Sequence, residues 1–329
     1  MIESIRFENF KVLRDTTLPL KPFTLIVGPN GSGKSTALQI LEITKQYFLK
    51  KQPPSTASVL TVGLGSQTVT VDLCWTGPPQ SARVRLEWKG PQSTMTSVDR
   101  DGRPLAPESQ ATLQHYFKNT FVYAFGSKSI AAPCTLKSSA ALQEDGTGLT
   151  AVLDQLRDES PERFDQLNEE LGRLIPEFDR ILFKTDRRGN RLFRLRQRHG
   201  HQAIRATDLS QGTLIALAIL TLAYMPNPPS IIGLEEPDRG LHPRLLRDIR
   251  DALYRLSYPK QFGETRKPVQ FFLDLFRDHP EEIVIANKEG QEAKFERLSD
   301  RPDIGELLGD ASLGDVWYSG ILGGVPCEK

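Results

Sequence analysis

The chain has 329 residues, of which 42 are Lys or Arg and 41 are Asp or Glu, so its net charge is +1. With 38% hydrophobic residues it can bury a sizeable core, and its charge balance excludes a uniformly basic nucleic-acid coat. The three cysteines lie far apart and form no CxxC pair, which favours a reducing compartment and argues against a structural zinc site.

No basic-then-apolar signal segment opens the chain. The longest nearly apolar stretch, residues 213–225, is shorter than the roughly 20 residues that span a bilayer. We therefore expect a cytoplasmic protein without a membrane partner.

The first 50 residues predict strands, a turn and a helix. Residues 2–10 alternate between apolar and polar side chains, which is typical of a strand, and residues 16–20 predict a second one. Residues 23–27 are continuously apolar, as in a strand buried on both faces. A glycine-rich turn follows, and residues 36–49 have the periodicity of a helix.

A β-rich insertion is predicted at about 55–100. Residues 68–73 and 82–88 have the period-two pattern of antiparallel strands and are separated by Gly-Pro-Pro. The aromatic residues of this insertion, Trp75 and Trp88 among them, are more typical of a core than of a base-stacking platform.

A helical lobe is predicted at about 107–225. Within it, residues 121–125 predict a strand that returns to the central sheet, and residues 147–175 are largely helical. Two strands follow around a turn at 187–190, and an apolar helix covers 210–224.

The last part, 226–329, predicts a strand at 230–234 and a helix at 243–256. No repeat or low-complexity linker is present, so we expect a single domain, residues 1–329. The predicted class is α/β, with a mixed central sheet, an antiparallel β lobe and a helical lobe.

Residues 28–35 form a complete G-x-x-x-x-G-K-[ST] phosphate loop between a predicted strand and helix. Its glycines allow a tight turn whose N–H groups converge on phosphate oxygens, and the helix start adds positive partial charge. Lys34 is expected to reach the β- and γ-phosphates, and the Ser35 hydroxyl to ligate Mg²⁺. An incidental turn is disfavoured by this context, so the sequence predicts a site for ATP and Mg²⁺. The residues expected at the nucleotide are Asn30, Gly31, Ser32, Gly33, Lys34, Ser35 and Thr36.

The strand predicted at 230–234 ends in Glu235 and Glu236, followed by proline. Glu235 stands where a Walker-B acid would hold the Mg²⁺ shell, and Glu236 is placed to polarise an attacking water. Alone, such a sequence is more often a solvated loop; beside a phosphate loop the catalytic interpretation is favoured. Glu236 and Lys34 are the candidate catalytic residues, and Ser35 and Glu235 the candidate metal ligands.

Residues 208–213 read Asp-Leu-Ser-Gln-Gly-Thr and open the apolar helix. Ser210 is a natural N-cap for that helix. The alternative is a nucleotide-sensing signature, in which the Ser210 hydroxyl and the Gly212 amide face the γ-phosphate of a nucleotide that another subunit holds.

Together these motifs resemble the ABC-type ATPase heads of the RecF, SMC and OLD (overcoming lysogenisation defect) group, over nearly the whole chain. The matching segments are Ile-Arg-Phe-Glu-Asn-Phe-Lys at 5–11, the phosphate loop, Glu-Asp-Gly-Thr-Gly-Leu at 144–149, Leu-Ser-Gln-Gly-Thr at 209–213, Leu-Glu-Glu-Pro-Asp-Arg-Gly-Leu-His-Pro at 234–243 and Leu-Gly-Asp-Val-Trp-Tyr-Ser-Gly-Ile-Leu-Gly-Gly at 313–324.

The resemblance implies a P-loop NTPase of the ABC-ATPase type that forms a homodimer or a higher homo-oligomer. Two nucleotides would lie between the phosphate loop of one subunit and the Ser210 motif of the other. Lys11 corresponds to the basic residue that approaches the nucleotide in these heads, and the turn at 238–242 would cross the interface. A separately encoded effector, such as a nuclease, and a setting in phage defence or DNA maintenance are also implied.

Two features depart from the family pattern. Gln211 stands where transporters carry Gly. After the helix at 243–256, such heads continue with a buried strand ending in Thr-His-Ser-Pro, whose His contacts the γ-phosphate. Here residues 267–270 run directly into 271–276, which resembles the helix after that strand. Either residues are missing from the sequence at this point or the protein lacks the strand, in which case we expect ATP binding with severely reduced turnover.

The segment from Arg187 to Arg205 contains seven arginines and no acidic residue. Its alternation places Arg194, Arg196 and Arg198 on one face of a strand. The segment is either a solvent-facing, salt-bridged strand or an electrostatic footprint for nucleic acid or an acidic partner.

Three functions are compatible with these patterns. The leading one is an ATPase that drives or gates a partner; the second is a hydrolysis-impaired scaffold whose assembly ATP fixes. The third, a nucleotide-binding subunit of a membrane transporter, is disfavoured by the RecF-like opening and the β-rich insertion. No Glu…Asp-x-Asp cluster follows Gln270, so we expect no intrinsic nuclease activity.

Overall fold

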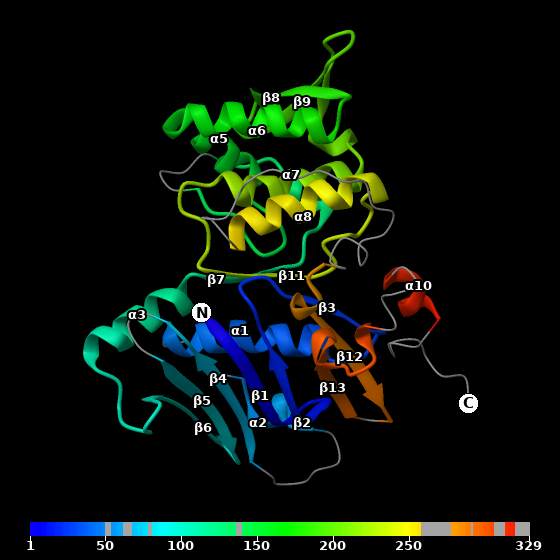
Figure 1. Ribbon diagram of the computed structural model, residues 1–329. Coiled ribbons are helices and arrows are strands. Elements are labelled where there is room, and N and C mark those ends of the chain that lie inside the picture. Colours follow the sequence, from blue (N-terminus) through cyan, green and yellow to red (C-terminus); the bar gives the residue numbers. More distant parts are fainter. Residues whose placement is uncertain are drawn as a thin grey trace. The chain divides into compact units, whose positions relative to one another are not determined.

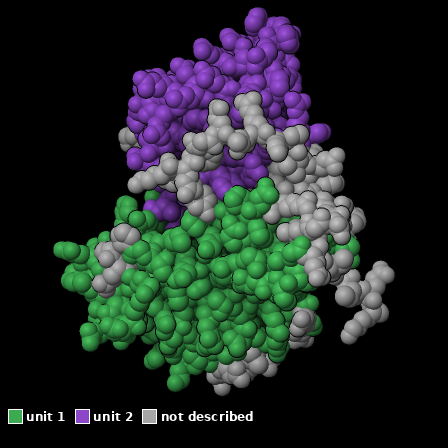
Figure 2. Space-filling view, viewed as in Figure 1, with its two compact units in different colours: residues 1–120, 271–329 green, residues 121–270 purple. Residues whose placement is uncertain are grey.

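The computed structural model describes residues 1–49, 54–61, 68–77, 81–135, 140–257, 278–290, 292–305 and 313–319. Figure 1 shows their helices and strands, and Figure 2 shows that the chain divides into two compact units. Unit 1 is Met1–Thr120 with Phe271–Lys329, and unit 2 is Phe121–Gln270. Within the described ranges, no helix is both long and apolar enough to span a bilayer.

Unit 1 contains an antiparallel five-stranded sheet in the order β2-β1-β4-β5-β6. Its strands are β1 (Ile2–Phe10), β2 (Leu13–Pro19), β4 (Val69–Trp75), β5 (Ala82–Lys89) and β6 (Gln92–Asp99). The predicted antiparallel β lobe is therefore confirmed. β2 begins earlier than the predicted strand at 16–20, because a tight turn pairs Leu13 directly with Phe10.

The core of this sheet is aromatic. Trp75 and Trp88, which were predicted to be core residues, are 4% and 0% exposed. The ring of Trp88 lies 6.2 Å from that of Phe10 on β1. Since such rings bury a large apolar surface, the sheet has one face committed to packing.

The helices of this unit are α1 (Lys34–Phe48), α2 (Thr56–Val59), α3 (Pro107–Lys118) and the short α10 (Leu313–Tyr318). α1 was predicted at 36–49. α3 lies with unit 1, although the sequence placed residues from 107 onwards in the helical lobe. The reason is aromatic packing: Phe117 stacks on Phe48 at 5.2 Å between ring centroids, and Tyr116 lies 4.8 Å from Trp75.

A second sheet of unit 1 has the order β13-β12-β3. Its strands are β3 (Leu25–Val27), β12 (Ile283–Glu289) and β13 (Glu292–Arg297). β12 runs parallel to β3 and antiparallel to β13, so the sheet is mixed, as predicted. β3 is half-buried, not buried on both faces, because β12 is its one strand neighbour among the described residues.

In unit 2, β7 (Thr120–Tyr123) pairs with β11 (Ile231–Leu234), which confirms the strands predicted at 121–125 and 230–234. The helices are α4 (Ser127–Ile130), α5 (Leu149–Glu159), α6 (Pro161–Leu174), α7 (Gln211–Tyr224) and α8 (Pro243–Ser257). The helical stretch predicted at 147–175 is two helices, because Pro161 starts a new one and cannot continue the old one. α7 is buried from Gly212 to Leu222 and packs against α4, α6 and α8.

A three-stranded sheet completes unit 2, in the order β10-β9-β8. Its strands are β8 (Phe178–Thr185), β9 (Arg191–Gln197) and β10 (Ala203–Arg205). As predicted, β8 and β9 form a hairpin around 187–190. The Asp186 carboxylate fixes this turn by accepting the N–H groups of Arg188 and Asn190, each at 2.8 Å.

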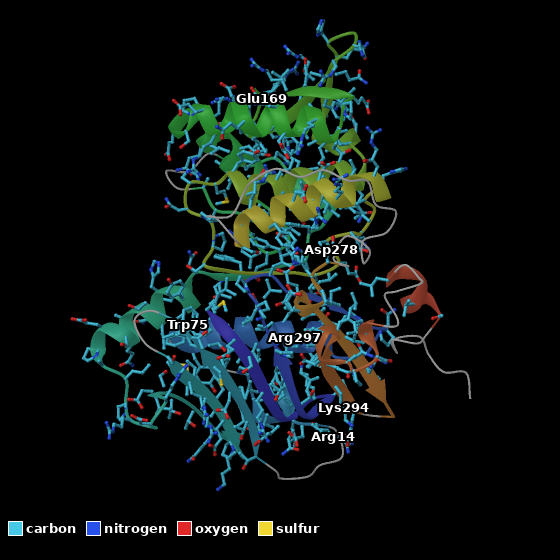
Figure 3. All side chains as sticks on the ribbon, in the orientation of Figure 1. Arg14, Trp75, Glu169, Asp278, Lys294 and Arg297 are labelled. Atoms are coloured by element: carbon cyan, nitrogen blue, oxygen red, sulfur yellow. The ribbon has the colours of Figure 1, made fainter. Side chains whose placement is uncertain are left out.

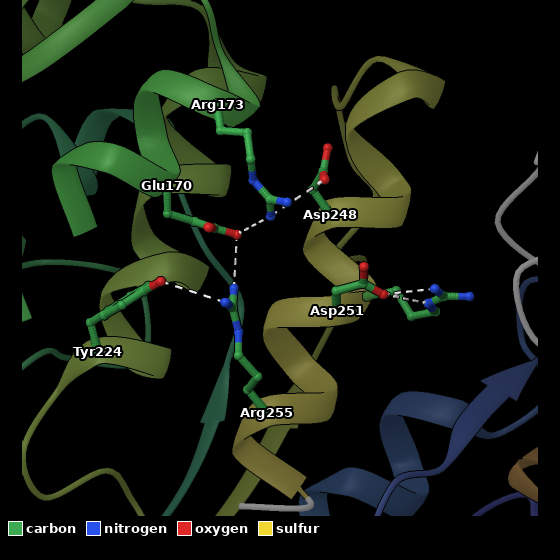
Figure 4. Close-up of polar contacts among 7 residues, drawn as sticks. Glu170, Arg173, Tyr224, Asp248, Asp251 and Arg255 are labelled. Carbon is green, nitrogen blue, oxygen red and sulfur yellow. Dashed lines mark hydrogen bonds and ion pairs between the residues drawn. The ribbon is translucent and has the colours of Figure 1, made fainter. Parts of the chain in front are cut away.

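A polar network joins helices α6, α7 and α8 (Figure 4). Glu170 accepts a hydrogen bond from Arg255 at 2.9 Å and also pairs with Arg173. Arg255 reaches the Tyr224 hydroxyl at 3.5 Å, and Arg173 lies 3.8 Å from Asp248. Burial raises the pKa of Asp248, because desolvation disfavours its charged form, and the positive charge of Arg173 opposes this rise. The network therefore joins the C-terminal end of α7 to α6 and α8.

Candidate nucleotide-binding site

The phosphate loop connects β3 to α1 in unit 1, as its sequence context predicts. Gly31 and Gly33 have φ of 77° and 89°, the left-handed region that only glycine adopts without strain. A Cβ at Gly28 would lie 2.3 Å from the carbonyl oxygen of Ala286 on β12. The glycines are therefore required by backbone conformation at two positions and by close approach at the third.

The start of α1 suits an anion. Gly33 provides no side-chain cap, and the first turn of α1 contains no acidic residue. Asn30, Gly31 and Ser35 are exposed. Since a helix N-terminus carries positive partial charge, this end of α1 attracts phosphate and presents backbone N–H groups to it.

The side chains of Lys34 and Ser32, both in the loop, lie in different environments. The Lys34 amine donates to the carbonyl oxygens of Gly28 and Pro29, at 2.7 and 2.8 Å, so a positive charge lies on the loop itself. Ser32 is fully buried and its hydroxyl has no hydrogen-bond partner among the described residues, so its contact with nucleotide stays a prediction. The amine of Lys34 and the exposed Ser35 hydroxyl are the donor set that ATP with Mg²⁺ requires, so these residues fit that ligand.

Lys11 lies against the same helix. Its backbone is left-handed, with φ of 52°, and its Nζ donates to Gln39 Oε1 at 2.6 Å. Gln39 is on α1, one turn beyond Ser35. The structure thus brings Lys11 to the helix of the phosphate loop, while its contact with nucleotide stays a prediction.

In unit 2, Ser210 is the N-cap of α7. Its Oγ accepts the N–H of Thr213 at 3.1 Å and lies 2.9 Å from the Thr213 hydroxyl. The capping interpretation is therefore correct. A role toward the nucleotide of another subunit stays a prediction, and it is compatible with the cap because Ser210 is exposed.

Gly212 has a packing role that the sequence did not indicate. A Cβ at this position would lie 2.3 Å from the carbonyl oxygen of Gly240, in the turn at 238–242. Gly240 is left-handed, with φ of 71°, and lies against the side chain of Gln211. The start of α7 and the turn after the paired carboxylates are thus held in direct contact.

The paired carboxylates follow β11. The N–H of Glu235 donates to the Tyr123 carbonyl oxygen on β7 at 2.8 Å, so Glu235 continues the strand pairing. Glu236 leaves the strand with a φ of 46° and is exposed. Such a conformation is strained for a residue with a Cβ, and strain of this kind concentrates at functional sites. Its carboxylate lies 3.8 Å from the Arg239 guanidinium.

Most of the basic segment is engaged within unit 2. Arg196 pairs with Asp179 through two hydrogen bonds of 2.8 and 3.0 Å. Arg198 donates to the carbonyl oxygens of Pro176 and Gly172 at the end of α6. The predicted common face of Arg194, Arg196 and Arg198 is thus tied at two of its three arginines. The segment after α8, where either residues are missing from the sequence or the protein lacks the strand, lies outside the described residues.

Comparison with known proteins agrees with these features. Residues 76–298 match a family described as "AAA domain, putative AbiEii toxin, Type IV TA system", and residues 1–150 match a family described as "AAA ATPase domain". The OLD nuclease of Thermus scotoductus is 46% identical over 43 residues, which are 13% of this chain and 8% of that protein. The SMC head domain from Thermotoga maritima is 16% identical, with a TM-score of 0.49, over 90% of this chain and 98% of that one.

The first family match covers more than half of the chain and includes both paired carboxylates and the start of α7. The second match covers the phosphate loop. The family matches confirm the predicted α/β P-loop ATPase domain, and the OLD match supports the resemblance to OLD-like ATPases over its 43 residues. The chain belongs to the AAA-domain family that matches residues 76–298.

Proposed function

We propose that this chain is a head that binds and hydrolyses ATP, closes with a second copy of itself around the nucleotide and gates a separately encoded effector. One observation carries the proposal, and it is the N-terminus of α1. This helix end follows a glycine, has no side-chain cap and no acidic residue in its first turn, and lies beside the Lys34 amine. A terminus of this kind binds a phosphate chain through backbone N–H groups and the helix dipole. Membership of an AAA family supports it.

The chemical roles follow from residue type. On binding, Lys34 would exchange the carbonyl oxygens of Gly28 and Pro29 for phosphate oxygens, and Ser35 and Glu235 would be the residues that hold Mg²⁺. When bound, Mg²⁺ neutralises charge on the β- and γ-phosphates. Glu236 accepts a hydrogen bond from the attacking water and orients it. Its exposed position leaves the carboxylate accessible to that water.

The homodimer is supported by the chemistry of Ser210. A hydroxyl has one proton to donate and two lone pairs to accept with. The Thr213 N–H occupies one lone pair, and when the Thr213 hydroxyl donates to the other, the Ser210 proton is available for a phosphate oxygen held by a second copy. The turn at 238–242 packs on Gly212 and would move with it, so closure and the position of Glu236 are coupled.

The effector is proposed from the comparisons. The OLD relative is named a nuclease, and its matched segment is 8% of its length. Because no Glu…Asp-x-Asp cluster follows Gln270 in this sequence, we propose that nuclease activity lies on a separate chain, in phage defence or DNA maintenance. Copurification of a second protein with metal-dependent cleavage activity would support this, and cleavage by the chain alone would contradict it.

Nucleic acid is a further proposed partner of unit 2. Strand register places Arg180, Arg194 and Arg205 on the same face of the β10-β9-β8 sheet. Substituting Arg194 and Arg205 by alanine should reduce the salt dependence of DNA binding by about one charge per residue. An unchanged slope would remove this partner from the proposal.

The alternative function is a scaffold in which ATP fixes the assembled state without turnover. The sequence favours it at one place, after the α8 helix, where no Thr-His-Ser-Pro strand follows. The two functions differ in their need for Glu236. An ATPase requires this carboxylate for hydrolysis, whereas a scaffold that only binds ATP does not.

Phosphate release from ATP, measured for the wild type, Glu236→Gln and Glu162→Gln, tests the proposal. Glu162 is an exposed carboxylate on α6 and serves as the matched control. We expect turnover by the wild type and Glu162→Gln, and a loss of about 100-fold or more in Glu236→Gln with nucleotide binding retained. Equal rates for all three proteins would contradict the role of Glu236, and no turnover by the wild type would favour the scaffold.

A further inference from the structure

The β12–β13 hairpin of unit 1 packs against the phosphate loop with one of its faces. Residues directly opposite each other in an antiparallel pair share a face, and neighbours along a strand alternate. The register pairs Ala286 with Phe295 and Lys288 with Ala293. These four side chains therefore lie on the same face of the hairpin.

Two of these residues contact loop glycines. A Cβ at Gly28 would lie 2.9 Å from the Cβ of Ala286, and a Cβ at Gly33 would lie 3.3 Å from the Cβ of Ala293. Small side chains at 286 and 293 thus let the loop rest on the hairpin. The face that carries Lys288 is the face that supports the nucleotide site.

Lys288 lies where the loop turns outward. β12 follows β3 in parallel up to the pair Ile285 and Val27, so the residues after Ile285 run beside the phosphate loop. A Cβ at Gly31 would lie 3.7 Å from Nζ of Lys288, which is the one non-adjacent atom of the described residues within 4 Å of that position. The lysine amine is therefore at the exposed rim of the loop, beside a residue whose left-handed backbone helps form the anion site.

The charge of Lys288 is not committed elsewhere in the described part of the chain. Its side chain is exposed, and no ion pair joins it to a described acidic residue. The nearby Glu292, which lies on the other face of the hairpin, pairs with Arg14 at 3.3 Å. An amine at a phosphate loop without a carboxylate partner is the arrangement expected of a phosphate ligand.

We propose that Lys288 is a phosphate-binding residue of the nucleotide site, which places a second lysine amine beside that of Lys34 on the triphosphate. The inference rests on the proposed function, because it requires that the loop bind ATP. It adds a contact from the far end of the sequence, 254 positions from Lys34 by their numbers (288 − 34). Since the amine acts on phosphate charge, its contribution grows with the number of phosphates.

The matched control is Lys294, which is labelled in Figure 3. It lies on β13 opposite Asn287, so it is on the other face of the same hairpin and is also exposed. Lys294→Gln and Lys288→Gln each remove one positive charge from the same β12–β13 hairpin. A thermal unfolding scan of each variant verifies that the hairpin remains folded.

The experiment measures binding of fluorescent ATP, ADP and AMP, each with Mg²⁺, to the full chain. We expect Lys288→Gln to weaken ATP binding roughly tenfold, ADP less and AMP least, as hydrogen bonds to charged groups allow. Lys288→Arg should restore most of the affinity, and Lys294→Gln should bind as the wild type does.

The outcomes separate the two proposals. If the wild type binds ATP and Lys288→Gln matches Lys294→Gln, the role of Lys288 is wrong while the ATP site stands. An equal loss for ATP and AMP would also overturn it, because the effect would then be structural. If the wild type binds none of the three nucleotides, the proposed function itself fails.

Discussion

Two helices of this protein begin in opposite ways. α1 follows Gly33, a left-handed glycine that offers no side chain to the helix end. α7 follows Ser210, whose Oγ accepts the N–H of Thr213. The first end has no acceptor of its own, whereas the second has one built in. A phosphate is therefore expected to gain most at α1 and to meet mainly a hydroxyl donor at α7.

A third helix shows that a glycine start is insufficient for an anion site. α5 follows Gly148, whose φ of 89° equals that of Gly33, and it too lacks a side-chain cap. However, the carboxylate of Asp145 lies in the turn just before it and accepts the Thr147 N–H and hydroxyl, each at 2.9 Å. Because negative charge is already present, we expect α5 to attract phosphate less than α1 does. What distinguishes α1 is a glycine start together with the Lys34 amine and no adjacent acid.

The largest expected effect is at α1. Lys34→Ala should weaken ATP binding about 100-fold, because the charge-assisted contacts of the amine are lost. Lys89→Ala, an exposed lysine on β5, is the control and should bind normally. Isothermal titration with ATP and Mg²⁺ measures both. Equal affinities would mean that the helix start alone binds the nucleotide.

At α7 the comparison predicts a stability effect. Gly212→Ala would place a Cβ 2.3 Å from the Gly240 carbonyl oxygen, and the overpacking should lower the free energy of unfolding by about 3 kcal/mol. Gly305→Ala is the control, since a Cβ there meets no described residue within 4 Å. Urea unfolding monitored by circular dichroism gives both values. A Gly212→Ala protein as stable as the control would mean that α7 and the turn at 238–242 are not tightly packed.

The polar network that joins α7 to α6 and α8 is tested at Glu170. Glu170→Gln removes a mostly buried carboxylate from Arg173 and Arg255 and should cost about 2 kcal/mol of unfolding free energy. Glu169, labelled in Figure 3, is its exposed neighbour, and Glu169→Gln should change the stability by less than about 0.5 kcal/mol. Similar losses for both would show that the network of Figure 4 contributes little.

The smallest effect concerns pH at the start of α5. The hydrogen bond from the Thr147 N–H is the main cause that lowers the pKa of Asp145. A lowered folded-state pKa stabilises the protein above the ordinary Asp pKa of about 3.9, and this contribution is lost as the pH falls through the folded-state value. Asp145→Asn should therefore be less stable than the wild type at pH 7 and approach it below about pH 4. A difference that is the same at both pH values would contradict this account.

Local motifs were predicted well because their information is local. The phosphate loop, the Ser210 cap and β11 each depend on a few consecutive residues, and their positions were confirmed. The break at Pro161 was missed because the prediction followed the helical periodicity and did not use Pro161, which is a local signal for a helix start. The membership of α3 in unit 1 depends on Phe117 meeting Phe48, a contact between distant positions that no local pattern contains.

Contacts between positions far apart in the sequence also explain what could not be predicted about the site. Gly212 was predicted as a nucleotide contact, and its packing on Gly240 became visible only with the fold. Lys288 belongs to no motif, and its place beside Gly31 results from the parallel pairing of β12 with β3. Alternating arginines predicted a basic face, but the pairing of Arg196 with Asp179 depends on strand register.

The most direct test is the mass of Glu236→Gln in solution, measured by light scattering with saturating ATP and Mg²⁺. Blocked hydrolysis should retain the closed state, so the account predicts the mass of at least two chains with ATP and of one chain without it. A protein that stays a single chain under both conditions would contradict closure around the nucleotide.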